Sequence, residues 1–79
     1  MSDPLSPKPL KGRVFNAIRE HRAKAGMTQQ MLADLAGATR QTIVAVEAGK
    51  YAPSLELAFR IARAFNAPFE AVWTFSPEE

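Results

Sequence analysis

Apolar residues recur at helical spacing in two short stretches between Thr28 and Gly49. In the first stretch the positions three and four apart are Met31, Leu32, Leu35 and Ala36. Thr28 precedes them and can accept hydrogen bonds from the free N–H groups of a first helical turn. Gly37 follows them and can adopt the left-handed conformation that ends many helices. This pattern predicts a helix over about residues 28–36.

A second helix is predicted directly after this glycine. Thr39 is its N-cap, Ile43 and Val46 form its buried side, and Gly49 is a plausible C-cap. The helix would cover about residues 39–48. Two short helices joined by a three-residue link have the layout of a helix-turn-helix, which favours a DNA-binding protein.

The segment before this motif allows two interpretations. A helix there is expected to end at Gly26. It can begin at Asn16, a good N-cap, which leaves residues 13–15 extended, or it can begin at Gly12 and continue without a break. In the first case residues 13–15 could pair with residues 73–75 as a small β-ribbon.

The segment after the motif predicts two more helices. Residues 50–53 form a loop, and Ser54 caps a fourth helix with a wide apolar face that ends at Asn66. Pro68 then opens a short fifth helix that runs through Trp73. The predicted fold is therefore an all-α, compact five-helix domain, with the small terminal β-ribbon left open.

The 79 residues suffice for one domain with a modest core. Residues 1–11 contain three prolines without periodicity and predict a flexible N-terminal arm. The domain is expected to cover residues 12–76, with residues 77–79 as a tail.

Composition excludes several classes of protein. The chain has no cysteine, so disulfides and thiol chemistry are excluded. No apolar run approaches the roughly 18 residues of a membrane span, and no signal-peptide pattern is present, so we expect a cytoplasmic protein. His21 is the one histidine and lacks sequence partners for a metal site or a catalytic base. We therefore expect no enzyme, metal site, cofactor or small-molecule ligand.

Positive charge is concentrated in the middle of the chain. All ten Lys and Arg lie between Lys8 and Arg63, where four acids oppose them, so this span has a net charge of +6. The other four acids lie near the ends. Such a distribution fits a basic face that contacts phosphates.

Several motifs follow one another along the chain: GMTQ (26–29), Ala33 with Gly37 four positions later, RQTI (40–43), VEAGK (46–50) and YAPSLELAFRIARAF (51–65). Together they resemble the XRE family of helix-turn-helix regulators, the group of the phage lambda repressor and Cro, over about residues 13–75. The resemblance implies a lambda-repressor-like domain that binds double-stranded DNA. It is closest to the minimal, homodimeric members that lack a sensor domain.

In the implied geometry the second helix of the motif enters the major groove, with its N-terminal residues nearest the base edges. Arg40 could then contact guanine and Gln41 adenine, each with two hydrogen bonds. Thr42 is a weaker candidate for a base contact. Val44 and Ala45 could meet a thymine methyl group, although Ala45 fits the core equally well.

The resemblance also implies contacts to the DNA backbone. Gln29 begins the first helix of the motif, where family members place a side chain against a phosphate. Thr39 is a second candidate, although capping also explains its hydroxyl. Lys50 and Tyr51 resemble the backbone-contacting loop of the family, but Tyr51 could instead pack against Pro53.

Arg22 and Glu47 occupy positions where the family often has a partly buried ion pair. We expect this pair to orient the recognition helix rather than to contact bases.

The C-terminal segment bears on oligomeric state. Its apolar residues are Phe69, Val72, Trp73 and Phe75. They could fill the core, but we favour a two-fold interface that presents two recognition helices to the DNA. The expected function is that of a repressor acting as a homodimer on an inverted-repeat operator. The alternative is an antitoxin-type module that neutralises a partner protein and regulates its own synthesis.

Overall fold

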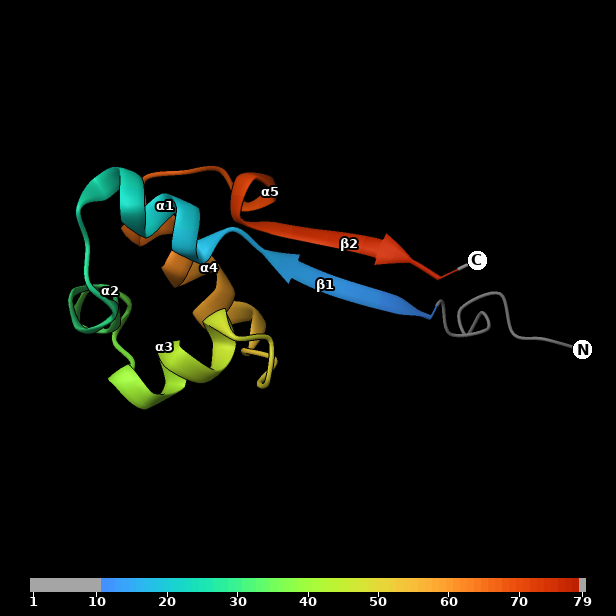
Figure 1. The fold of residues 1–79 in the computed structure, drawn as a ribbon, viewed down its shortest axis with the longest axis horizontal. Coiled ribbons are helices and arrows are strands. Elements are labelled where there is room, and N and C mark those ends of the chain that lie inside the picture. Colours follow the sequence, from blue (N-terminus) through green and yellow to red (C-terminus); the bar gives the residue numbers. More distant parts are fainter. Residues whose placement is uncertain (1–10, 79) are drawn as a thin grey trace, which may run out of the picture.

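Five helices and a two-stranded ribbon make up residues 11–78, the part of the chain that this computed structural model describes. The elements are β1 (Gly12–Asn16), α1 (Ile18–Ala25), α2 (Gln29–Ala36), α3 (Arg40–Glu47), α4 (Leu55–Ala64), α5 (Phe69–Val72) and β2 (Trp73–Pro77). Figure 1 shows the ribbon projecting away from the packed helices. The expected arm lies, apart from Lys11, outside the described residues.

Side-chain caps begin three of the helices. Thr28, Thr39 and Ser54 each accept a hydrogen bond from the backbone N–H three residues further on, at 3.0, 3.1 and 3.1 Å. Gly26 and Gly37 have positive φ angles of 64° and 69° and end α1 and α2. These short-range features set the helix boundaries because each satisfies backbone groups that a helix end leaves free.

The end of α3 differs by one residue from the prediction. Ala48 is the C-cap, and Gly49 follows it with a φ of 74°. The N–H of Lys50 donates to the carbonyl of Ala45 at 2.9 Å, which closes the last turn. Gly49 therefore ends the helix from the position after the cap.

The extended interpretation of residues 13–15 is correct, and a helix that begins at Gly12 is wrong. β1 pairs antiparallel with β2, so that Val14 lies opposite Phe75 and Asn16 opposite Trp73. Strand pairing provides hydrogen-bond partners for the backbone N–H and C=O groups of this segment, so a helix is not needed. The ribbon extends one residue beyond each end of the predicted segment in β1 and two residues further in β2.

The core lies between the helices and the base of the ribbon. Its buried side chains are Ile18, Leu32, Ala33, Ala36, Ile43, Val46, Leu57, Ala58, Ile61, Ala62, Val72 and Trp73. The indole N–H of Trp73 donates to the carbonyl of Ala58 at 3.0 Å, so the polar atom of this large side chain is satisfied within the core. The packing of α2 against both α3 and α4 fixes the angle of the helix-turn-helix.

Two predicted apolar positions of α2 lie outside the core. Met31 and Leu35 are 48% and 62% exposed, whereas Leu32 and Ala36 are fully buried. The inner face of α2 is completed by Ala33, whose small side chain allows the neighbouring helices to approach closely.

Candidate nucleic-acid interface

The recognition helix α3 has one buried side and one open side. Ile43 and Val46 are buried against the rest of the domain. The five expected base-reading residues lie elsewhere on the helix: Arg40, Gln41 and Val44 are exposed, and Thr42 and Ala45 are partly buried. At the start of α3 the fold therefore leaves Arg40 and Gln41 accessible.

The hydroxyl groups of Thr39 and Thr42 lie 2.9 Å apart, within hydrogen-bonding distance. Thr39 also caps α3 through its side-chain oxygen. Both hydroxyl groups thus already take part in hydrogen bonds at the start of α3. A hydrogen bond to DNA would have to form beside these bonds or replace one of them.

Three elements meet in a polar hollow of about 620 Å³ beside the start of α3. Arg19 of α1, Gln29 of α2 and Arg40 of α3 all line it. The hollow brings the expected phosphate contact Gln29 beside the expected base contact Arg40. Arg19 carries no signal in the sequence that separates it from an ordinary surface charge, and its place here became visible with the fold.

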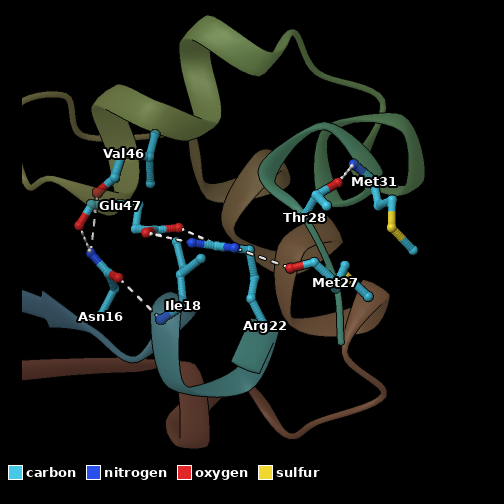
Figure 2. A network of polar contacts seen from close by, with 8 residues as sticks. All are labelled: Asn16, Ile18, Arg22, Met27, Thr28, Met31, Val46 and Glu47. Carbon is cyan, nitrogen blue, oxygen red and sulfur yellow. Dashed lines mark hydrogen bonds and ion pairs between the residues drawn. The ribbon is translucent and has the colours of Figure 1, made fainter. Parts of the chain in front are cut away.

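An ion pair links α1 to the end of α3. The Arg22 guanidinium donates two hydrogen bonds to the Glu47 carboxylate, from Nε at 2.8 Å and from Nη2 at 2.9 Å. Its Nη1 donates to the carbonyl of Met27 at 3.0 Å, which also ties the turn between α1 and α2 (Figure 2). The two side chains are 18% and 11% exposed, so the pair expected from the resemblance is present and partly buried.

This ion pair shifts the proton equilibria of both partners. The hydrogen bond from Arg22 lowers the pKa of Glu47 below its ordinary value of 4.5, although burial opposes the shift. The nearby Gln29 and Arg19 lower the pKa of Glu47 further. The hydrogen bond to Glu47 raises the pKa of Arg22. Both groups therefore favour their charged forms.

Asn16 makes a second link to the end of α3, which sequence reasoning missed. Its side-chain amide donates to the carbonyl oxygens of Val46, at 3.1 Å, and Glu47, at 3.4 Å, while its side-chain oxygen accepts from the N–H of Ile18 at 3.1 Å (Figure 2). The sequence predicts Asn16 as the N-cap of the first helix, whereas Ala17 is the N-cap and Asn16 lies one position before it. A contact across thirty positions leaves no local pattern that could have predicted it.

The loop after α3 presents Lys50 and Tyr51 to the surface, where Tyr51 is 55% exposed. Tyr51 lines an apolar groove of about 830 Å³ together with Pro53 and the ribbon residue Phe15. Its ring therefore borders this groove, while Lys50 lies outside the groove lining.

The four residues expected at a dimer interface divide into two groups. Val72 and Trp73 are 1% and 9% exposed and belong to the core of a single chain, which corrects the expectation for these two. Val72 ends α5 and packs in the core, so the fifth helix stops one residue before Trp73. Trp73 begins β2, and its indole lies against α4, where it donates to Ala58. Phe69 is partly buried, and Phe75 is 46% exposed on the ribbon, so these two remain near the surface.

Within residues 11–78 there is no group of three or more His, Cys, Asp or Glu side chains that could hold a metal ion. In the same part of the chain, none of the helices has the length and apolar character needed to cross a membrane.

Comparisons with known proteins agree on this architecture. A helix-turn-helix family model matches residues 18–72. An uncharacterized HTH-type transcriptional regulator of Archaeoglobus fulgidus is 58% identical over 62 residues, which cover 78% of this chain and 89% of that relative. One from Bacillus subtilis is 43% identical over 63 residues, covering 80% and 96%.

Solved structures show the same arrangement of helices. The restriction-modification controller protein C.AhdI from Aeromonas hydrophila matches with a TM-score of 0.66 at 31% identity, over 68% of this chain and 82% of that one. The transcriptional regulator VanUg matches with a TM-score of 0.71 over 91% of this chain and 96% of its own. Its identity is 18%, so that likeness concerns the fold alone.

Proposed function

Because this chain belongs to the XRE family of helix-turn-helix transcriptional regulators, which bind DNA and are not enzymes, we propose that it represses transcription from one specific operator. The observation that carries the proposal is the accessible start of α3, where Arg40 and Gln41 are exposed while Ile43 and Val46 anchor the helix. In this arrangement α3 enters the major groove. Arg40 reads guanine, Gln41 reads adenine, and Val44 and Ala45 meet thymine methyl groups.

The DNA backbone is held on both sides of α3. Gln29, with Arg19 beside it, contacts a phosphate near the polar hollow. Thr39 and Lys50 supply further contacts before and after the helix, and Tyr51 adds one if its ring turns out of the apolar groove. Such contacts fix the register on the duplex without reading its sequence.

We further propose that the protein binds its operator as a homodimer. The apolar groove next to the ribbon is lined by exposed side chains of Phe15 (49%), Tyr51 (55%), Leu55 (68%) and Phe75 (46%). Phe59 (53% exposed) packs against Phe69, with ring centroids 4.6 Å apart and ring planes tilted by 40°. We call these six side chains the apolar face. Because five of these side chains are about half exposed or more, the face offers roughly 500 Å² of apolar surface, compared with the ~800 Å² per partner of a standard interface.

A two-fold dimer built on this face would present two recognition helices about 34–36 Å apart, one turn of DNA. The operator would then be an inverted repeat. Repression follows most simply from occupancy, because a bound dimer excludes polymerase from an overlapping promoter.

Selection of bound sequences from a random duplex pool tests the proposal. The expected result is an inverted repeat whose half-site centres lie about 10 base pairs apart. Enrichment of a single half-site would leave base reading intact and overturn the dimer. Failure to enrich any sequence would overturn the proposal that the protein recognises specific DNA. Repression is tested by locating the selected operator at its promoter, and activation of that promoter by the protein would overturn it.

A further inference from the structure

Asn16 lies where the ribbon joins the helical part of the molecule. It is the last residue of β1 and lies opposite Trp73 in the ribbon. The next residue, Ala17, donates its N–H to the carbonyl of Val72 at 2.9 Å. The base of the ribbon is therefore fixed to the core at Asn16 and at the residue after it.

From this position the side chain of Asn16 reaches the last turn of α3. Its amide group points at the carbonyl oxygens of Val46 and Glu47, as Figure 2 shows. Carbonyl groups in the last turn of a helix lack the usual partner four residues on, although that of Val46 accepts from the N–H of Gly49 at 3.0 Å. The Asn16 amide therefore holds the backbone of α3 itself. Arg22, in contrast, holds α3 through the side chain of Glu47.

Both polar atoms of the Asn16 side-chain amide form hydrogen bonds. The oxygen accepts from the N–H of Ile18 and so helps to begin α1, while the nitrogen donates to α3. Asp could serve as the acceptor but not as the donor, and its charge would face the negative end of the α3 dipole. Ser could accept from the N–H of Ile18 but is too short to reach α3.

We propose that Asn16 is a positioning residue for base readout, which fixes the end of the recognition helix relative to the ribbon and α1. The inference rests on the proposed reading of bases by α3. Base contacts require placement within about 0.5 Å, whereas contacts to phosphates tolerate more movement because they are largely electrostatic. Loosening α3 should therefore reduce discrimination between sequences more than it reduces general affinity for DNA.

The experiment compares Asn16→Asp and Asn16→Ser with Ser54→Ala. Ser54→Ala removes the cap of α4, a bond to the N–H of Leu57, without touching α3, and so controls for a loss of stability alone. For each variant the dissociation constants are measured at one salt concentration for the selected operator and for a scrambled duplex of equal length. Melting curves verify that each variant is folded at the assay temperature, and Asn16→Ser carries the test should Asn16→Asp fail to fold.

In the Asn16 variants we expect the ratio of scrambled to operator dissociation constants to fall about three- to tenfold. Binding to the scrambled duplex should stay within about twofold, and Ser54→Ala should retain the wild-type ratio. An unchanged ratio in the Asn16 variants, or an equal fall in Ser54→Ala, would overturn the positioning role while leaving the proposed function intact. A wild-type protein without preference for any duplex would overturn the proposed function and this inference together.

Discussion

Glu47 shows how a single side chain can restrain the recognition helix. A carboxylate in the last turn of a helix is disfavoured by the negative end of the helix dipole. The two hydrogen bonds from Arg22 offset this cost and bind α3 to α1. The charge of Glu47 is therefore tolerated because Arg22 meets it in a partly buried place.

The lowered pKa of Glu47 makes part of the stability depend on pH. Because the folded pKa lies below the ordinary value of 4.5, the contribution is fully present above about pH 4.5 and is lost as the pH falls through the folded pKa. We expect Glu47→Gln to lower the free energy of unfolding by about 2 kcal/mol at pH 7, with the difference from wild type narrowing on acidification. Urea unfolding at several pH values between 7 and 3 measures both effects.

Glu56→Gln is the matched control for this prediction. Glu56 pairs with Arg60 at 2.9 Å, but the two side chains are 79% and 46% exposed. Its loss should change stability by less than about 0.5 kcal/mol. If the two variants behaved alike at every pH, the ion pair of Glu47 would have no special role.

Arg40 and Gln29 have different proposed roles, because Arg40 contacts bases and Gln29 contacts a phosphate. Arg40→Ala should relax the preference at one base pair at a cost of about 1–3 kcal/mol against the cognate sequence. Gln29→Ala should weaken binding evenly across sequences and leave the preferred sequence unchanged. Repeating the duplex selection with each variant gives the answer, and an altered consensus in Gln29→Ala would reverse the assignment of roles.

Sequence reasoning at this scale succeeded where a residue acts locally or occupies a strong family position. The caps at Thr28, Thr39 and Ser54 needed only a three-residue pattern. The contact of Asn16 with α3 depends on how the ribbon is placed against the helices, and no local pattern encodes that placement.

Among the elements, the ribbon depended most on tertiary context. Residues 12–16 alone fit either a helix or a strand, and pairing with Trp73–Pro77 decides between them. In α2 the apolar spacing located the helix but did not identify its buried face, because Met31 and Leu35 point outward while Ala33 packs inside. Small residues at helix contacts carry little hydrophobic signal, so the apolar spacing alone left the buried face of α2 open.

Gly12 permits the close pairing of the ribbon. A Cβ atom at this position would collide with Cζ of Phe75 and lie 2.6 Å from the backbone oxygen of Ser76. Gly12→Ala should therefore push the strands apart and destabilise the protein by about 1–3 kcal/mol. Amide hydrogen exchange should accelerate in β1 and β2 while the helices keep their protection.

Gly49→Ala serves as the control for this prediction. Gly49 has a φ of 74°, and a Cβ atom added there would meet no neighbour within 4 Å, so its replacement costs about 1 kcal/mol through backbone strain alone. Exchange in the ribbon should then match wild type. Equal acceleration of ribbon exchange in both variants would mean that the crowding at Gly12 is not the cause.

For the molecule as a whole, the candidate DNA contacts and the apolar face use different parts of one small domain, except for Tyr51, which belongs to both sets. The polar hollow lies at the starts of α2 and α3, whereas the apolar groove lies along the ribbon, the end of α3 and α4. The sequence predicts a dimer surface at the C-terminus. It does not separate Trp73, which is buried, from Phe75, which is exposed, because both are large aromatic residues in one strand.

Phe75 and Leu55 make the dimer testable. Both line the groove and are 46% and 68% exposed, so removing either side chain should change the folding stability little. Self-association should weaken at least tenfold, which corresponds to about 1.4 kcal/mol. Sedimentation velocity over a range of concentrations measures the dissociation constant of Phe75→Ser and Leu55→Ser. Leu35→Ser is the matched control, since Leu35 is 62% exposed on α2 and does not line the groove.

Binding to DNA supplies the second readout for the same variants. If the apolar face joins two copies, Phe75→Ser should bind a full inverted repeat hardly better than a single half-site, because the gain from two linked recognition helices is lost. Leu35→Ser should keep the wild-type advantage of the full site. A wild-type protein that sediments as a monomer at tens of micromolar, with and without operator, would contradict the dimer. Recovery of a stoichiometric second protein bound to the apolar face would instead favour the antitoxin-type alternative.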